Sequence, residues 1–84
     1  MDATEQEVRE FLAEHVLTDE EANELELDES LLRNGVLNSL TLNTLVVHLE
    51  RSHCFTVTPA EFEPVNFKSI RAICSFVEQK TGRG

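Results

Sequence analysis

The sequence is poor in aromatic residues, glycine and proline, with five phenylalanines, three glycines, two prolines and no tryptophan or tyrosine. The aromatic and β-branched runs of an all-β fold are therefore missing. The two cysteines, Cys54 and Cys74, are too few for a disulfide framework and lack the spacing of a zinc site. With 84 residues, the chain is predicted to be one small all-α domain, with free thiols in a reducing cytoplasm.

Basic residues are also scarce, since seven Lys and Arg stand against sixteen Asp and Glu, a formal net charge of -9. This balance argues against nucleic-acid binding and favours partners with basic surfaces. Twelve of the sixteen acids lie between Asp2 and Glu29. The acidic N-terminus has no apolar signal-peptide region, and polar residues interrupt the most apolar stretch, residues 36–49, so we expect no membrane segment.

The first third of the chain is predicted to form one helix and a long loop. Thr4 and Glu7 fit a Thr-x-x-Glu capping box, which predicts a helix from about Glu5 to Leu17. Its apolar face is expected to contain Val8, Phe11, Leu12 and either His15 or Val16. Residues 18–34 are acidic and are predicted to form a loop, pinned across the bundle by Leu25, Leu27, Leu31 and Leu32.

A second helix is predicted after Gly35, which can adopt the positive φ of a tight turn. Asn38 and Ser39 are both good capping residues, and the helix is expected to run from Leu40 to about Ser52. The residues predicted to face the core are Leu42, Leu45, Val46 and Leu49.

The last third is predicted to hold a connector, one helical turn and a final helix. Residues 55–57 read as an extended connector, and residues 58–62 as a turn capped by Thr58 and ended by Pro64. Asn66 is expected to cap a helix from about Phe67 to Gln79, followed by a frayed tail at residues 80–84. The core residues of this helix are predicted to be Ile70, Ile73, Cys74 and Val77. The expected fold is a bundle of three main helices with a long first loop.

One stretch carries a family resemblance. Residues 34–40, Asn-Gly-Val-Leu-Asn-Ser-Leu, resemble the signature of acyl and peptidyl carrier proteins, in which a glycine and apolar residues precede Asp-Ser-Leu at a helix start. Residues 55–62, followed by Asn-Phe-Lys-Ser-Ile at 66–70, are similar to the second half of the same family. The resemblance spans about residues 5–79 and implies an acyl-carrier-like bundle.

The resemblance implies that Ser39, flanked by Asn38 and Leu40, carries 4′-phosphopantetheine donated by coenzyme A. A phosphopantetheinyl transferase would attach this arm, and loading, acyltransferase and synthase enzymes would exchange an acyl or aminoacyl cargo held as a thioester. The carrier would be a cytoplasmic monomer that catalyses no reaction itself. A helix start suits the phosphodiester, because unpaired amides and the helix dipole stabilise an anion there.

The sequence departs from the family pattern in two ways. Asn38 stands where the family has Asp, and residues 40–49 contain no Asp, Glu, Lys or Arg, whereas fatty-acid carriers have an acidic helix here. An uncharged docking face resembles carriers of polyketide or nonribosomal biosynthesis, and we expect it to consist of Leu40, Asn43, Thr44 and Val47. Alternatively, Leu40 and Val47 are half-buried against the leucines of the loop.

Other functions are weighed against the carrier. Ser39 is otherwise a plain N-cap, and the chain an unmodified helical interaction module that presents its acidic loop and second helix. A hydrolytic triad is not expected, because Ser39 and His48 are more than two helical turns apart. His15, His48 and His53 lack metal-ligand spacing, so they are predicted to be surface residues, and Cys74 is predicted to be core.

Overall fold

The computed structural model describes residues 3–82, which form five helices and no strand. Three are long and two are short: α1 (Ala3–His15), α2 (Asp19–Glu24), α3 (Ser39–His53), α4 (Pro64–Phe67) and α5 (Ile70–Thr81). The all-α class and the three main helices are confirmed. No helix in the described part of the chain is both long and apolar enough to cross a bilayer.

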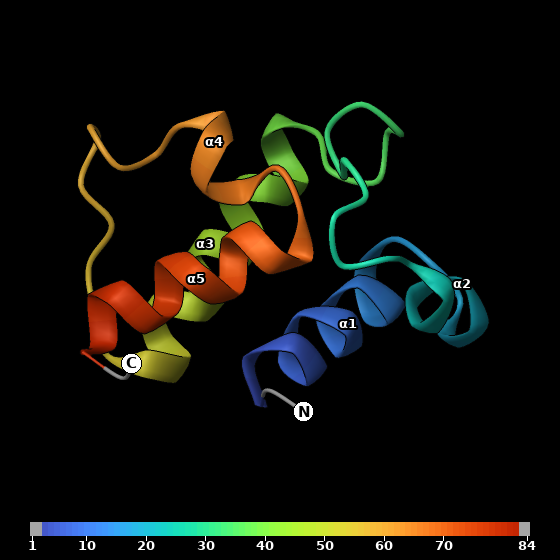
Figure 1. The fold of residues 1–84 in the computed structure, drawn as a ribbon, viewed down its shortest axis with the longest axis horizontal. Coiled ribbons are helices and arrows are strands. Elements are labelled where there is room, and N and C mark those ends of the chain that lie inside the picture. Colours follow the sequence, from blue (N-terminus) through green and yellow to red (C-terminus); the bar gives the residue numbers. More distant parts are fainter. Residues whose placement is uncertain (1–2, 83–84) are drawn as a thin grey trace.

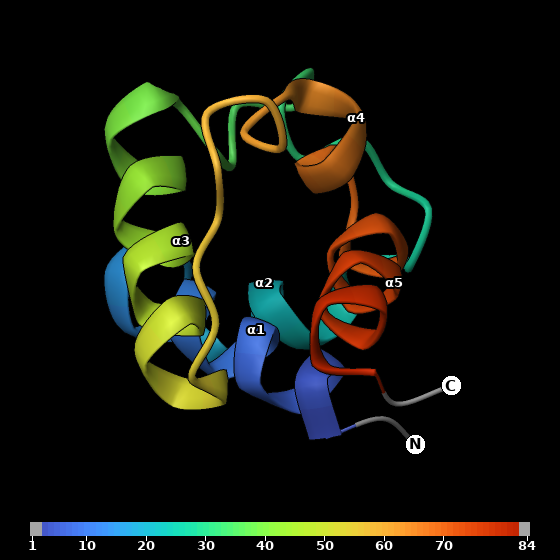
Figure 2. The ribbon, with the colours of Figure 1, turned by 90° about the vertical axis from the view of Figure 1, so that its left-hand side faces the viewer.

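The helices surround one core. Helix α1 contacts α2, α3 and α5, while α3 also contacts α5 (Figure 1). The connector after α3 runs back along that helix towards α4, and α5 then descends on the other side of the molecule (Figure 2). This path brings the beginning of α4 close to the beginning of α3, where Ser39 lies, because residues of both line one surface hollow.

The predicted core faces of the later helices are confirmed. Helix α3 buries Leu42, Leu45, Val46 and Leu49, and α5 buries Ile70, Ile73, Cys74, Phe76 and Val77. Helix α1 contributes Val8, Phe11 and Leu12, which were also predicted. The prediction that His15 or Val16 fills the next core position is wrong, because both are exposed, Val16 at 39%. Burial of these regular apolar faces provides the main driving force for folding.

The start of α1 differs from the prediction. The helix begins at Ala3, so Thr4 lies inside it and is buried rather than capping it. The Glu7 side chain, expected to complete a capping box with Thr4, contacts His48 and His53 of α3 instead. A long-range pairing has therefore taken the carboxylate that the local pattern assigned to the helix start. The helix also ends at His15, two residues before the predicted Leu17.

The long first loop contains a helix that the prediction missed. Thr18 and Glu21 form a reciprocal capping box that starts α2, with the Thr18 Oγ1 accepting from the Glu21 amide at 3.1 Å. The first turn holds three acids, which the positive end of a helix favours. Beyond α2, the expected pinning is confirmed: Leu25 and Leu31 are buried, and Leu27 and Leu32 pack partly buried against the core.

The end of the chain differs at three points. Pro64 starts α4 instead of only ending the preceding turn, because a proline at the first helical position loses no hydrogen bond. Asn66 lies within α4, and Ser69 caps α5 by accepting from the Ala72 amide at 3.1 Å. Helix α5 continues to Thr81, two residues beyond the predicted end, while positions 83–84 of the predicted tail lie outside the described residues.

The connector between α3 and α4 follows the prediction. Residues 55–57 belong to no helix or strand, and the connector that contains them runs along α3 (Figure 2). The amides of Glu61 and Phe62 then both donate to the Thr58 carbonyl, which forms the predicted single turn.

Candidate functional site

The chain enters α3 through a turn centred on Gly35. Gly35 has a φ of 82°, a conformation that other residues resist. The Val36 amide donates to the Asn34 Oδ1 at 3.0 Å, and the Leu37 amide donates to the Leu31 carbonyl at 2.9 Å. Leu37 is buried at 2% exposure, so the residues just before Ser39 are anchored on the core.

Asn38, not Ser39, caps α3. Its side-chain Oδ1 accepts from the Thr41 amide at 2.9 Å, and its carbonyl accepts from the Leu42 amide at 2.8 Å. Ser39 is the first residue of the helix and is exposed. Among residues 3–82 its hydroxyl has no hydrogen-bond partner, so the plain capping role is taken by its neighbour.

The start of α3, where Ser39 lies, favours a negative charge. The first turn of α3 contains no acid, and the first amides of a helix have no partner within it. These amides form the positive end of the helix dipole, which stabilises an anion by about 0.3–1 kcal/mol at an exposed position. A phosphate ester on the Ser39 oxygen would therefore lie in a favourable field.

A surface hollow of about 510 Å³ lies beside Ser39. One side is formed by the turn and the start of α3, and the other by Phe62, Glu63 and Pro64. Its apolar wall residues are Leu32, Leu37, Leu42, Phe62 and Pro64. A second hollow of about 470 Å³ lies between α1 and α2 and is lined mainly by polar residues, away from Ser39. The first hollow is part of the candidate site, because it adjoins the exposed Ser39 hydroxyl.

The four residues predicted as a docking face are all exposed on α3. They are Leu40, Asn43, Thr44 and Val47. Leu40 is 77% exposed and Val47 is 40% exposed, so the alternative in which both are half-buried by the loop does not hold for Leu40. The Thr44 hydroxyl donates to the Leu40 carbonyl at 3.0 Å and is thus partly satisfied within the helix.

Sequence reasoning missed the contribution of α4 to this site. Phe62 and Val65 are 40% and 56% exposed, and Phe62 lies in the wall of the hollow. They are more than twenty residues from Ser39 in sequence, and no local pattern links them. The only signal was Pro64, which marks a helix start as readily as a helix stop.

The histidines at the other end of α3 form an unexpected cluster. The Nε2 atom of His53 lies 2.7 Å from Glu7 Oε1, and that of His48 lies 3.0 Å from Glu7 Oε2. The His48 contact has ion-pair distance but not hydrogen-bond geometry, since Oε2 has no hydrogen-bond partner. Burial acts to raise the pKa of Glu7, but hydrogen bonds from Ser52 and His53 and the nearby histidine charges lower it overall.

The cluster of Glu7, His48 and His53 is too far from Ser39 to act on its hydroxyl. His48 is nine residues further along the helix, about 13.5 Å along its axis, which is out of hydrogen-bond reach. No group of three potential ligands within the described residues has the geometry of a metal site. Cys74 is buried as predicted, and Cys54 ends α3 in a left-handed conformation with a φ of 59°.

Comparison with models of known protein families and with curated proteins finds no match for this chain.

Proposed function

We propose that the chain is a discrete acyl carrier protein that holds an acyl or aminoacyl cargo on a 4′-phosphopantetheine arm joined to Ser39. The observation that supports this most is the exposed Ser39 hydroxyl at the first residue of α3, without a hydrogen-bond partner in the described chain. The Asn-Ser-Leu signature at positions 38–40 adds the family resemblance.

The residues around Ser39 fit such an arm. The Ser39 oxygen would bear the phosphodiester, and the amides at the start of α3 would stabilise its negative charge. Asn38 would keep the helix start in place through its bond to the Thr41 amide. When bound, the arm supplies a terminal thiol that carries the cargo as a thioester. Tethering raises the concentration of the cargo at partner enzymes without any chemistry by the carrier.

The exposed face of α3 beside Ser39 favours one class of biosynthetic pathway for the carrier. Leu40, Asn43, Thr44 and Val47 are exposed and uncharged, so we expect partner enzymes to dock through apolar and hydrogen-bonding contacts. Such docking resembles that of carriers in polyketide or nonribosomal biosynthesis. Its affinity should depend little on salt, because few ion pairs would form. Twelve acids lie in the first third of the chain, and those exposed at the surface, such as Glu14 and Glu20, would suit basic regions of a partner.

The direct test is attachment of the arm. The protein is incubated with coenzyme A and a broad-specificity phosphopantetheinyl transferase, and its mass is measured. We expect a gain of one phosphopantetheine in the natural protein and in Ser75→Ala, which changes an exposed serine on α5. The gain should be abolished in Ser39→Ala.

Absence of the gain with several active transferases would contradict the carrier proposal. The chain would then fit the second candidate, an unmodified interaction module. The observation that favours this candidate is the uncharged exposed face of α3, where two apolar side chains, Leu40 and Val47, are 77% and 40% exposed.

A further inference from the structure

The hollow beside Ser39 has one fixed wall and one wall on a connecting segment. The fixed wall includes Leu37 and Leu42, which are buried in the core at 2% and 8% exposure. The opposite wall is formed by residues 62–64, at the junction of the connector and the four-residue helix α4. The width of the hollow therefore depends on what holds residues 62–64 in place.

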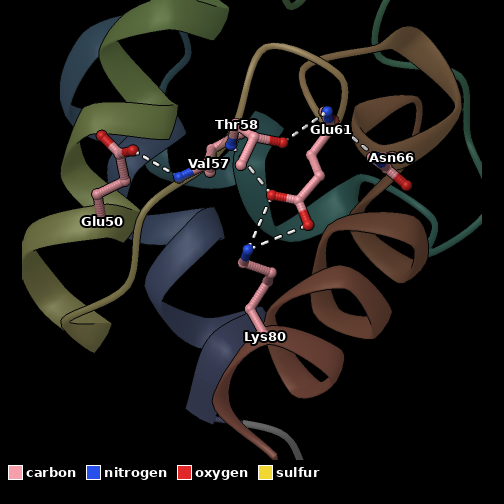
Figure 3. Close-up of polar contacts among 6 residues, drawn as sticks. All are labelled: Glu50, Val57, Thr58, Glu61, Asn66 and Lys80. Atoms are coloured by element: carbon pink, nitrogen blue, oxygen red, sulfur yellow. Dashed lines mark hydrogen bonds and ion pairs between the residues drawn. The ribbon is translucent and has the colours of Figure 1, made fainter.

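Glu61, directly before this wall, is the centre of the contacts that hold it (Figure 3). Its carboxylate accepts from Lys80 Nζ at 2.8 and 3.0 Å and from the Thr58 amide at 3.0 Å. Its amide donates to the Thr58 hydroxyl at 3.3 Å. Its carbonyl accepts from the Asn66 side chain at 2.7 Å. One residue thus joins the connector, α4 and α5.

The wall itself has little other anchorage. The residue before α4, Glu63, makes no side-chain capping bond. Phe62 is 40% exposed, although its ring meets the buried Phe67 edge-on with centroids 6.0 Å apart. Upstream, the Val57 amide donates to the Glu50 carboxylate at 2.8 Å, which fixes the connector to α3 before the turn. Between Val57 and the start of α4, the side-chain contact of the described connector with α5 is the Glu61–Lys80 pair.

The Glu61–Lys80 pair is placed to resist opening. The two side chains are only 32% and 23% exposed, so water screens their attraction less than at an open surface. The hydrogen bond from Lys80 is the main cause that lowers the pKa of Glu61, so the carboxylate stays charged into mildly acidic solution. Each partner lies on a different element, and the two are nineteen residues apart.

We infer that the Glu61–Lys80 pair is a latch that keeps residues 62–64 against the hollow and sets how often the hollow opens beside Ser39. This inference goes beyond the proposed function, because the latch acts on the fold whether or not Ser39 is modified. Opening would uncover the apolar wall residues and Phe67, and would change the shape of the surface that a partner meets at the start of α3.

The test measures local opening by amide hydrogen exchange, residue by residue. The reporting amides are those of Phe62, Glu63 and Asn66, which donate to carbonyls between Thr58 and Glu63, in and directly before the wall. Replacing Lys80 with methionine keeps most of the side-chain length and removes the charge. In Lys80→Met we expect these amides to exchange about two- to fivefold faster, as loss of one partly exposed ion pair predicts. Core amides of α1 and α3 should change much less.

The matched control is Lys68→Met, because Lys68 is exposed and its ammonium forms no hydrogen bond or ion pair among the described residues. It should leave the exchange of the reporting amides unchanged. Lys80→Arg keeps the charge and should retain slow exchange. The double variant Glu61→Gln, Lys80→Met should exchange at nearly the rate of either single variant, because both changes remove the same interaction. Equal acceleration in Lys68→Met, or no acceleration in Lys80→Met, would overturn the latch.

Discussion

The two ends of α3 have opposite surroundings. At its beginning, Ser39 and Leu40 are exposed, and no charged group occupies the first turn. At its end, His48 and His53 meet Glu7 of α1, and Glu50 binds the connector through the Val57 amide. The end is held by polar contacts with other elements, while the side-chain hydrogen bond at the beginning comes from the cap residue Asn38.

This difference indicates that the two ends of α3 have different roles. Contacts at the end of α3 fix its position relative to α1 and the connector. The beginning can then present the exposed Ser39 hydroxyl on a rigid element without enclosing it, which suits the proposed attachment of an arm. Variants that act on one end only can show whether the two ends are energetically separate.

The largest effect should come from the middle of the helix, where the two ends are joined. Leu45 is fully buried, so Leu45→Ala should lower the free energy of unfolding by about 2–4 kcal/mol. Amide exchange should then accelerate at both ends of α3 alike. Urea unfolding gives the first quantity, and Leu40→Ala serves as the control, with a change within about 0.5 kcal/mol. An equal cost for Leu40→Ala would mean that the exposed end is not open in solution.

A smaller loss should follow from Glu7→Gln at the anchored end. Removing the charge weakens the contacts with His53 and His48, which should lower the free energy of unfolding by about 1.5 kcal/mol at neutral pH. Because folding lowers the pKa of Glu7, its contribution is present above its ordinary value of 4.5 and is lost as the pH falls through the lowered value.

The stability gap between the natural protein and Glu7→Gln should therefore begin to shrink near pH 4.5 and close as the pH falls through the lowered pKa of Glu7. Urea titrations at several pH values measure the gap. Glu14→Gln, an exposed change on the same helix, should show no such gap. A gap that persists unchanged into acid would show that the charge of Glu7 contributes nothing.

At the open end, Asn38→Ala should lower the free energy of unfolding by about 1 kcal/mol through loss of the cap. Asn38→Asp should leave stability nearly unchanged, since both residues cap well, and it restores the carboxylate that the carrier signature usually has. Thermal unfolding measures the first effect, and the rate of arm attachment measures the second. If Asn38→Ala were as stable as Asn38→Asp, the capping bond would have no energetic role.

The smallest change in stability is expected for Val47→Glu on the exposed face of α3, within about 0.5 kcal/mol. Transfer of cargo to a partner enzyme should nevertheless fall, while arm attachment at Ser39 stays largely intact. Val47→Thr preserves the shape and lacks the charge, so it should retain most of the transfer. Unchanged transfer in Val47→Glu would remove Val47 from the docking face.

The regular elements could be predicted because their apolar residues repeat over three or more turns, as in α3 and α5. Helices α2 and α4 have six and four residues, too few for a periodic signal. The position of Ser39 at a helix start was also predictable from Gly35 and Asn38. The hollow beside it was not, because its second wall is formed by residues distant in sequence.

The Thr-x-x-Glu pattern does not by itself determine whether a capping box forms. It occurs at Thr4, Thr18 and Thr58, each three residues before a glutamate. The second and third form reciprocal bonds, whereas the first does not, because Glu7 binds histidines more than forty residues away. Three identical local signals thus have different outcomes, decided by partners that only the tertiary structure brings near.

The position of Lys80 has a practical consequence for anyone who shortens or fuses this chain. Lys80 lies in the last turn of α5, four residues from position 84, where a tag or a linker would commonly be joined. A version cut after Gln79 would keep every buried residue of α5 and still lose the tie to Glu61. Such a protein should fold and melt almost normally, yet present a looser surface beside Ser39. Versions meant for binding studies should therefore retain the last turn of α5 through Gly82, whose amide closes the helix on the Glu78 carbonyl.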